Sequence, residues 1–349
     1  MSDLTGPIHV VGAGLLGASI GLACRRAGLE VLLSDRNPDH VRTASGLGAG
    51  TPYAGQPAQL VVVAVPPDQL AAEISAALAT GAVVTDVGSV KSQPLTQATG
   101  ELSNYVGGHP MAGSERSGPL AASAGLFDGR PWAITPHAGS TEVATDLVTE
   151  LVVLCGAVPV RLTPEEHDRA VARTSHLPHL LAALVAGRLA DAPVDHLALS
   201  GQGVRDVTRI AGGDPELWQQ IVTANAVAVL ELLGEVRGQL DVLIDAVGSG
   251  SREDLVAVLE HGVSGTRAIP GKHGGPLTPM RSVFVSVPDH PGELARLFFD
   301  AGASEVNIED IHIDHDPGRP VGLVELLVAE SRAEHLLASL EAKGWAVHR

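Results

Sequence analysis

Aromatic side chains are scarce in this 349-residue chain, which has four phenylalanines, three tryptophans and two tyrosines. Hydrophobic residues still make up 45% of the sequence, so the core must be built mainly from alanine, valine and leucine. Charged residues account for only 18%. This balance is typical of a compact globular protein and argues against extensive disorder. The length allows two or three domains.

Cysteine and long hydrophobic runs are also rare. Cys24 and Cys155 are the only cysteines. They have no Cys-x-x-Cys or metal-ligand spacing, so we expect buried thiols in a reducing compartment and no metal site. The first apolar run, 8–11, stops at Gly12, and no run reaches the roughly 18 to 20 residues that span a bilayer. These absences predict a cytoplasmic protein with no membrane partner.

Positive charge is the third scarcity. Lysine and arginine total 23 against 40 aspartates and glutamates, which gives a formal net charge of −17. This charge argues against nucleic acid and anionic membranes as partners. It also means that an anionic substrate needs a local cluster of arginine or histidine.

Short apolar segments alternate with helix-like segments over the first half of the chain. Continuous apolar strands between helices indicate a parallel sheet that is covered on both faces. We therefore predict an α/β Rossmann-type domain over 1–163. Its expected strands are 8–11, 31–34, 60–65, 83–86 and 158–162, with a helix at about 141–155.

The remaining chain predicts two further domains and a linker. Residues 164–269 contain few strand signals and several long helices, the longest expected near 215–247 and apolar on more than one face. Such a helix is typically buried between others, including those of a second subunit. The glycine- and proline-rich stretch 270–279 reads as a linker. Residues 280–349 follow a β-α-β-β-α pattern with a short final strand, which predicts a small ferredoxin-like α+β domain.

A glycine-rich turn joins the first expected strand to the first helix in the pattern Gly12-x-Gly14-x-x-Gly17. Gly12 permits the tight turn, Gly14 lets the backbone approach a pyrophosphate, and Gly17 allows close packing of helix on strand. The helix N-terminus offers N–H groups and a positive dipole end to the phosphates. Asp35, at the end of the second strand, is placed to accept hydrogen bonds from the adenosine ribose.

These features predict a dinucleotide site. A carboxylate at Asp35 repels a 2′-phosphate and favours NAD over NADP, whereas its neighbour Arg36 leaves NADP open. The expected cofactor-binding residues are Gly12, Gly14, Leu15, Leu16, Gly17, Asp35, Arg36, Val65 and Pro66.

His109 lies in the run Gly107-Gly108-His109-Pro110, just after the dinucleotide-binding strands. Histidine is suited to proton transfer near neutral pH, and the glycines allow close approach of a backbone and a planar ring. Beside a nicotinamide, this combination suggests a general base for oxidising an alcohol. Taken alone, the segment favours an ordinary glycine- and proline-containing turn, and the rest of the chain reverses this preference.

Three further polar clusters are candidate substrate contacts. The segment 86–91 follows a parallel strand, at the edge where open α/β sheets bind ligands. His176 and His179 are three residues apart on one helix face, for which packing is the alternative. Arg205 and Arg209 are four apart and could clamp a carboxylate. Their alternative is a solvated face, although the apolar neighbours of Arg209 favour partial burial.

Five segments together resemble a known family. They are the glycine-rich turn, DVGSVK at 86–91, GGHPMAGSERSG at 107–118, EEHD with SHLPH at 165–179, and RDVTRIAGGDPELW at 205–218. Over about 8–265 the chain resembles the prephenate dehydrogenase family, which includes arogenate dehydrogenases. The resemblance implies NAD-dependent oxidative decarboxylation of prephenate to 4-hydroxyphenylpyruvate in tyrosine biosynthesis, and a helical domain that forms a homodimer. Arogenate, with an amino acid side chain, is the alternative substrate.

The resemblance also implies site roles. His109 would accept the hydroxyl proton, Ser89 would orient that histidine, and Arg209 would hold a substrate carboxylate. His167 and Asp168 would position the second domain without touching substrate. The other implied substrate-binding residues are His176, His179, Ser114, Glu115, Arg205 and Trp218.

The C-terminal segments VPDHPGEL at 287–294 and VNIEDIHI at 306–313 resemble an ACT domain, a small amino-acid-binding regulatory module. The pathway then suggests tyrosine as a feedback inhibitor, whereas a module that only assists assembly is the alternative. The implied effector-binding residues are Asp289, His290, Gly292, Leu294, Asn307 and Ile308.

Two other functions remain as hypotheses. A 3-hydroxy acid dehydrogenase also joins a Rossmann domain to a helical domain, but it generally uses a catalytic lysine there, and 163–268 has no lysine. A nucleotide-sensing regulator would explain both ends of the chain. It would have no need for Ser89, His109, His179 and Arg209 together.

Overall fold

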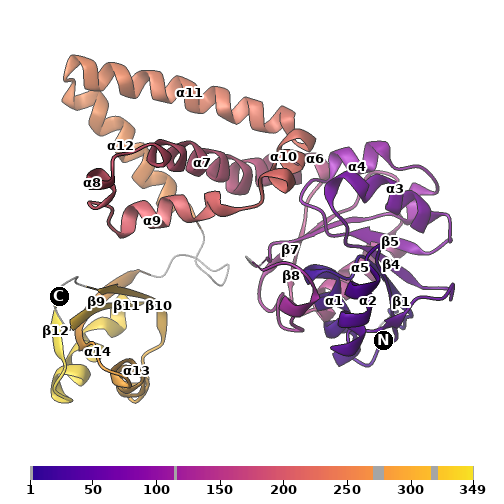
Figure 1. Cartoon of the computed structure of the whole chain (residues 1–349), viewed down its shortest axis with the longest axis horizontal. Helices are drawn as coiled ribbons and strands as arrows, with labels where there is room; N and C mark the ends of the chain where they lie inside the picture. The colour runs from indigo at the N-terminus through magenta and orange to yellow at the C-terminus, as the bar shows by residue number, and fades with distance from the viewer. Residues whose placement is uncertain (1–2, 114–115, 270–278, 316–320, 349) are drawn as a thin grey trace. The chain divides into compact units, whose positions relative to one another are not determined.

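The computed structural model describes residues 3–113, 116–269, 279–315 and 321–348. The chain divides into two compact units, Met1–Ile244 and Asp245–Arg349. Figure 1 labels their helices and strands. Each unit is described by itself.

A five-stranded parallel sheet forms the first part of the first unit, in the order β3-β2-β1-β4-β5. Because β1 pairs with both β2 and β4, the strand order reverses at β1. Ligands bind at the carboxyl edge beside such a reversal. The strands are β1 (Ile8–Val11), β2 (Val31–Ser34), β3 (Thr51–Pro52), β4 (Leu60–Val63) and β5 (Val83–Asp86).

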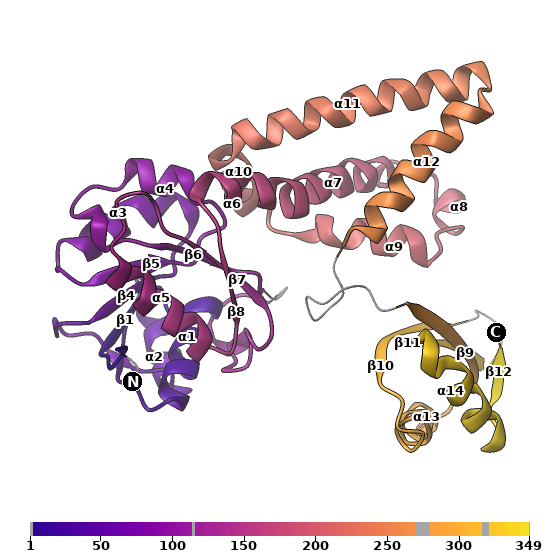
Figure 2. The ribbon, with the colours of Figure 1, turned by 180° about the vertical axis from the view of Figure 1, so that it is seen from behind.

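Helices cover both faces of this sheet, as the continuous apolar strands require. On one face α1 (Leu15–Arg26) and α5 (Glu142–Leu154) pack on Ile8, Val10 and Val62 (Figure 2). On the other, α3 (Pro67–Leu78) packs on Val61 and Val63. Two more helices, α2 (Pro38–Gly46) and α4 (Ser92–Gln97), and two 3₁₀ turns, η1 (Leu102–Asn104) and η2 (Pro119–Ala121), complete the connections.

A second sheet, in the order β6-β7-β8, continues beyond β5. Its strands are β6 (Gly107–Pro110), β7 (Pro131–Thr135) and β8 (Val158–Arg161). A parallel bridge between Val84 and Tyr105 places β6 beside β5. The pair β6 and β7 is antiparallel, whereas β7 and β8 are parallel. The strand expected at 158–162 therefore belongs to a separate, mixed sheet and not to the five-stranded parallel sheet. His109 therefore lies in a strand and not in a turn.

The helical part begins with α6 (Pro164–Val171), where Thr163 and Glu166 form the reciprocal hydrogen bonds of a capping box. A π-helical segment, η3 (Ala172–His176), joins α6 to α7 (Leu177–Ala190). Pro178 has no N–H to donate to the preceding turn, which favours this irregularity. Next come α8 (Val194–Leu197), α9 (Gln202–Thr208) and the 3₁₀ turn η4 (Arg209–Gly212).

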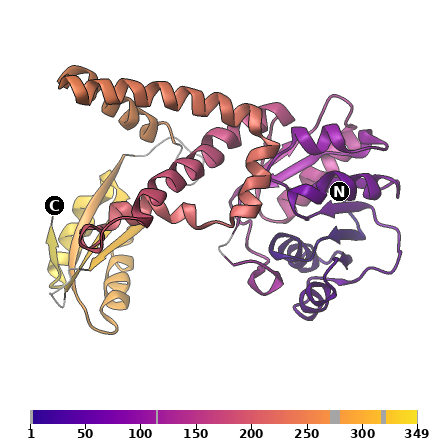
Figure 3. The ribbon, with the colours of Figure 1, turned by 45° about the horizontal axis from the view of Figure 1, so that its top comes forward.

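The prediction of a single helix near 215–247 is wrong. The structure has α10 (Pro215–Ala224) and α11 (Ala226–Ser249), and the chain changes direction between them (Figure 3). Asn225 lies at the break with φ −114° and ψ 31°. Its side-chain amide donates to the carbonyl oxygen of Asp168 at 2.7 Å, so a buried tertiary contact interrupts the helix.

The second unit holds α12 (Arg252–Arg267) and a four-stranded antiparallel sheet in the order β10-β11-β9-β12. Its elements are β9 (Met280–Pro288), α13 (Glu293–Gly302), β10 (Ile308–His315), β11 (Val321–Ala329), α14 (Glu330–Ala342) and β12 (Ala346–His348). Helices α13 and α14 pack on one face of this sheet, around Val285, Leu326 and Leu336. The order is that of a ferredoxin-like fold, as predicted.

Several expectations drawn from scarce residues can be compared with the structure. Cys24 and Cys155 are buried free thiols, as expected. None of the helices in the described ranges is long and apolar enough to cross a membrane. The expected linker, 270–279, lies almost wholly outside the described residues.

Candidate active site

The glycine-rich turn has the geometry that a pyrophosphate requires. A Cβ on Gly12, whose φ is +99°, would lie 2.2 Å from the Ala64 carbonyl oxygen, and one on Gly17 would lie 1.9 Å from the Gly12 carbonyl oxygen. Gly14 is different, because nothing lies within 4 Å of its Cβ position. Gly12 and Gly17 therefore let the turn close, whereas Gly14 leaves open space at the N-terminus of α1.

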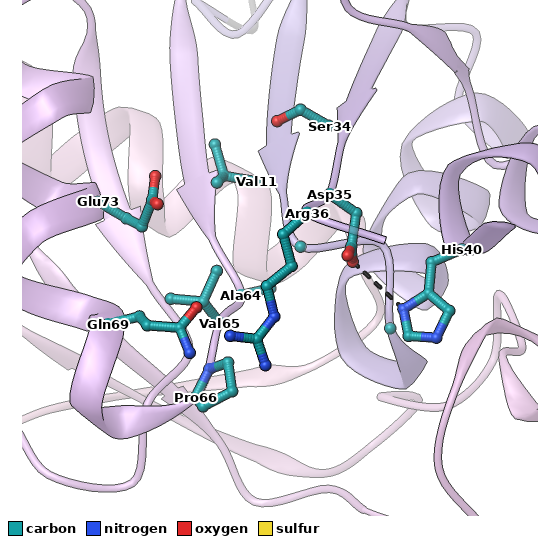
Figure 4. Close-up of a pocket in the computed structure, with 12 residues that line it drawn as sticks. Val11, Ser34, Asp35, Arg36, His40, Ala64, Val65, Pro66, Gln69 and Glu73 are labelled. Carbon is teal, nitrogen blue, oxygen red and sulfur yellow. Dashed lines mark hydrogen bonds and ion pairs between the residues drawn. The ribbon is translucent and has the colours of Figure 1, made fainter. Parts of the chain in front are cut away.

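A cavity of about 470 Å³ opens at this turn (Figure 4). Asp35 forms one wall, and its carboxylate accepts hydrogen bonds from the backbone N–H of Ala13 and of Asn37, each at 2.8 Å. His40 Nδ1 lies 3.4 Å from the same carboxylate. The lining residues are Val11, Gly12, Gly14, Ser34, Asp35, Arg36, His40, Ala64, Val65, Pro66, Gln69 and Glu73.

Most of the predicted cofactor residues meet at this cavity. The exceptions are Leu15 and Leu16, which open α1 without lining it, and Gly17, which lies behind the turn. The sequence prediction missed the other lining residues, which are Val11, Ser34, His40, Ala64, Gln69 and Glu73. Of these, His40 lies on α2, whereas Gln69 and Glu73 lie on α3, and only the folded sheet brings both helices to one cavity. In Figure 4, Arg36 extends toward the side formed by Val65 and Pro66.

These residues fit NAD. The open space at Gly14 meets free N–H groups of the first turn of α1, which carries no acidic residue and no side-chain cap. The carboxylate of Asp35 is a ready acceptor for ribose hydroxyls and a poor neighbour for a 2′-phosphate. Arg36 and His40 lie beside Asp35 in the lining of the cavity.

His109 comes to the carboxyl edge of the sheet through close packing of β6 on β5. A Cβ on Gly108 would lie 2.7 Å from the Asp86 carbonyl oxygen, and one on Gly107 would lie 2.5 Å from Thr135 Oγ1. The two glycines therefore allow β6 to pack closely against β5 and β7. The expectation that they admit a planar ring finds no support in these contacts.

A buried polar cluster lies under β6. Lys91 pairs with Asp86 and donates to the Gly108 carbonyl oxygen at 2.7 Å. Tyr105 donates its hydroxyl to Asp86 at 2.9 Å. Burial, followed by the Asp86 carboxylate, raises the pKa of Tyr105 well above 10, so the phenol stays a donor. The prediction that 86–91 contacts substrate therefore fails for Asp86 and Lys91, which are fully buried.

His109 is the first member of a hydrogen-bonded chain. Its Nδ1 lies 2.9 Å from His167 Nε2, and His167 Nδ1 lies 2.9 Å from Asp168 Oδ1. The other ring nitrogen of His109, Nε2, has no hydrogen-bond partner among the described residues. Burial lowers the pKa of His109 well below 6.5, and His167, Lys91 and His176 lower it further. The imidazole is therefore neutral near pH 7, the state that a proton acceptor needs.

His167 and Asp168 were assigned only to domain positioning, and their contacts show more. The Asp168 carboxylate accepts backbone N–H groups of Lys91 at 2.8 Å and Ser92 at 2.9 Å, which ties α6 to the start of α4. At the same time the pair extends to His109. Sequence reasoning missed this chain because 58 residues separate His109 from His167.

The two histidines of SHLPH take different surroundings. His179 stacks on Trp218 with ring centroids 3.6 Å apart, and it bonds the backbone of Ile210. His176 is buried and faces Asn225 Nδ2 at 3.2 Å. Burial lowers the pKa of His176 to about 4. Gly213 makes room for the indole, because a Cβ there would lie 2.4 Å from Trp218 Nε1.

The remaining predicted substrate residues are less constrained. Arg205 lies in α9 and Arg209 begins η4, and both are exposed, so the expected partial burial of Arg209 is wrong for this structure. Ser89 is half-buried and makes no hydrogen bond to His109 among the described contacts. Ser114 and Glu115 lie outside the described residues.

The predicted effector residues do not form one site within a single module. Asp289, His290 and Gly292 form the turn after β9, and Leu294 lies in the first turn of α13. Ile308 pairs with Val328, near the opposite end of the sheet from Pro288. Asn307, which precedes Ile308, therefore lies far from the turn.

Comparison with known families gives the site its context. Residues 20–161 match the model of the prephenate dehydrogenase nucleotide-binding domain, and residues 163–261 match that of the prephenate dehydrogenase dimerization domain. A probable prephenate dehydrogenase of Streptomyces niveus is 38% identical over 355 residues, covering 96% of this chain and 98% of that protein. This chain belongs to the prephenate dehydrogenase family. It is therefore an oxidoreductase with a nucleotide-binding domain, a dimerisation domain and a small-molecule substrate.

Solved structures of the family share this fold. A prephenate dehydrogenase from Aquifex aeolicus, solved with hydroxyphenyl propionate and NAD⁺, is 27% identical with a TM-score of 0.67, over 74% of this chain and 96% of that one. An arogenate dehydrogenase from Synechocystis is 28% identical with a TM-score of 0.65, over 74% and 98%. Dehydrogenases named for prephenate and for arogenate thus share this fold.

Proposed function

We propose that this prephenate dehydrogenase family member catalyses the NAD-dependent oxidative decarboxylation of prephenate to 4-hydroxyphenylpyruvate, with His109 as the proton acceptor. The observation that carries the proposal is the neutral imidazole of His109 at the carboxyl edge of the sheet, with its Nδ1 engaged by His167 and its Nε2 without a hydrogen-bond partner among the residues that the structure describes. The cavity at Gly14 and Asp35 opens on the same edge.

The overall reaction oxidises a ring alcohol and releases carbon dioxide. Bound NAD supplies the hydride acceptor. His109 takes the hydroxyl proton, so that the ring C–O bond becomes a carbonyl as the hydride departs. Loss of the carboxylate on the opposite ring carbon then leaves its electron pair in the ring, which becomes aromatic. The aromatic product makes the reaction favourable overall.

The remaining predicted residues have supporting roles. Arg209, with Arg205 one helical turn away, offers guanidinium groups to a substrate carboxylate in a protein of net charge −17. We assign His176 and the stacked pair of His179 and Trp218 to the walls of the substrate site, where they would offer apolar surface and hydrogen-bonding groups. Ser89 lies on the loop after β5, and we assign it to orienting the hydroxyl.

Arogenate is the second candidate substrate. The Synechocystis relative, which is similar over 74% of this chain, is named an arogenate dehydrogenase, and this supports arogenate as an alternative. The ring chemistry and the role of His109 are the same for both substrates. Only the group at the side chain differs, a keto acid or an amino acid.

We also propose tyrosine as feedback inhibitor acting through the C-terminal module, and a homodimer through the helical part. The ferredoxin-like topology of 280–348 supports the first proposal. The second is supported by the match to a dimerization domain and by apolar side chains exposed along α11. These are Val227, Leu230, Leu240, Val242, Ile244 and Val247.

The deciding experiment is the initial rate of NADH formation at 340 nm with prephenate and arogenate in parallel, each with NAD and with NADP. We expect turnover with prephenate and NAD. Preference for arogenate would keep the mechanism and change the substrate. Turnover with neither would overturn the proposed reaction.

A further inference from the structure

The hydrogen-bonded chain behind His109 ends at a carboxylate that can only accept. Asp168 takes N–H groups from Lys91, Ser92 and His167. Burial alone would raise the pKa of Asp168, but its hydrogen bonds with His167, Ser92 and Lys91 outweigh burial and hold the pKa below its usual value. The carboxylate is therefore ionised at neutral pH and has no proton to donate.

This acceptor determines where the protons of the chain reside. His167 Nδ1 faces Asp168 Oδ1 and must carry a hydrogen, so in a neutral ring His167 Nε2 is an acceptor. His109 Nδ1, 2.9 Å away, must then be the donor. A neutral His109 with its hydrogen on Nδ1 leaves the lone pair on Nε2. Nε2 is the nitrogen that has no hydrogen-bond partner among the described residues.

We propose that His167 and Asp168 are positioning residues that fix the reactive tautomer of His109, with Nδ1 protonated and Nε2 free to accept the substrate proton. The inference rests on the proposed function of His109. Once Nε2 takes a proton, the imidazolium donates a stronger, charge-assisted hydrogen bond to His167. The hydrogen bond between His109 Nδ1 and His167 Nε2 is therefore kept when His109 takes the substrate proton.

The surroundings of the chain keep His167 neutral. Burial lowers the pKa of His167, and Lys91 lowers it further against the opposing effect of Asp168. The charged or titratable groups that act on His109 come from three sides: His167 on α6, Lys91 from the loop before α4, and His176 on η3. Protonation of His167 would place a hydrogen on both of its nitrogens. His109 would then have to accept at Nδ1 and lose its lone pair on Nε2.

The first test compares His167→Leu with His167→Gln. Leucine removes the acceptor at Nε2, whereas the glutamine carbonyl can still accept from His109 Nδ1. We expect His167→Leu to lower kcat roughly 10- to 100-fold with NAD affinity changed less than about twofold. His167→Gln should recover most of the lost kcat. The exposed His196→Leu in α8 is the matched control and should leave kcat unchanged.

The second test observes the tautomer directly and requires no turnover. In the full chain labelled with ¹⁵N-histidine, the His109 signals, assigned by their loss in His109→Asn, should show a protonated Nδ1 and an unprotonated Nε2 at pH 7. In His167→Leu the two tautomers should both be populated. A wild-type His109 protonated on Nε2 would overturn the inference, and so would full kcat in a folded His167→Leu. If the wild type turns over neither substrate, the NMR result still decides the tautomer.

A second inference stands on the contacts of Asn225. Its Nδ2 donates to the Asp168 carbonyl oxygen, an atom that can only accept, and the same amide faces His176 Nδ1 at 3.2 Å. The amide's second hydrogen then points to His176 Nδ1, which accepts it. We infer that Asn225 holds His176 neutral with its hydrogen on Nε2.

Asn225→Leu tests this assignment. Without the amide donor, we expect His176 to populate both tautomers in the same NMR experiment. NAD affinity and the far-ultraviolet circular dichroism spectrum report whether the break between α10 and α11 survives. A wild-type His176 protonated on Nδ1, or a single tautomer kept in a folded Asn225→Leu, would refute the inference.

Discussion

At the scale of single residues, the environment of His109 sets its pH dependence. Its pKa lies well below 6.5 because of burial and of His167, Lys91 and His176. The deprotonated form is the active one, so kcat/KM should fall as the pH decreases through this low pKa and should show no histidine-dependent loss between pH 6.5 and 8. A pH–rate profile measures it. An acid limb centred at or above pH 6.5 would contradict the environment described.

Replacing the base tests its role. His109→Asn should lower kcat by about 10²- to 10⁴-fold, because an amide cannot take up the substrate proton at neutral pH. NAD affinity, measured by fluorescence titration, should stay within about twofold, since His109 does not line the cofactor cavity. A fully active variant would remove His109 from the mechanism.

Arg209 is predicted to act through binding. Arg209→Ala should raise KM for prephenate about 10- to 100-fold with a smaller effect on kcat, because an anion loses its bidentate partner. Arg209→Lys keeps the charge without the fork and should fall between. The exposed Arg188→Ala in α7 is the control. A pure kcat effect would argue against an anchoring role.

Two glycines of the turn are predicted to have different roles, one in folding and one in cofactor binding. Gly17→Ala places a Cβ 1.9 Å from the Gly12 carbonyl oxygen and should lower the free energy of unfolding by about 1–3 kcal/mol. Gly14→Ala has open space and should fold normally but weaken NAD about tenfold or more, where the pyrophosphate would approach. Urea denaturation and NAD titration distinguish the two. Equal stability loss in both variants would refute this division.

At the scale of elements, α11 carries an apolar surface that its own chain leaves open. Leu230 is 67% exposed, which is costly in water unless a partner covers it. If this face forms the homodimer, Leu230→Glu should raise the dimer dissociation constant about 100-fold or more, because a charge would be buried without a partner. Sedimentation velocity measures this. Gln239→Glu, an exposed change on the same helix, should leave the dimer intact.

At the scale of the whole molecule, the C-terminal module has its own core of valines and leucines. A chain ending at Ile269 should therefore keep kcat and KM within about twofold while losing its response to tyrosine. Steady-state rates with and without tyrosine test this. A truncated enzyme that tyrosine still inhibits would place the effector site elsewhere, and an insensitive full-length enzyme would end the feedback proposal.

Local patterns in the sequence determined much of this protein. Apolar strands alternating with helices predicted the parallel sheet, and Gly12, Gly14 and Gly17 predicted the cofactor turn, because each of these patterns can be recognised within a short stretch of sequence. The ferredoxin-like order of the C-terminal strands also followed from its β-α-β-β-α pattern. Histidine in a glycine run pointed to His109 as a candidate.

Only the tertiary structure decided what surrounds that histidine. Hydrogen bonds link His109 to His167, and Asp168 to Lys91 and to Asn225, across separations of 58, 77 and 57 residues. No helical or strand period connects such distant positions. The contact between Asn225 and Asp168 lies at the break in the expected 215–247 helix, and the pairing of β6 with β7 puts His109 in a strand. Where a side chain's partners come from another part of the fold, packing and burial set its role, and local spacing carries no record of them.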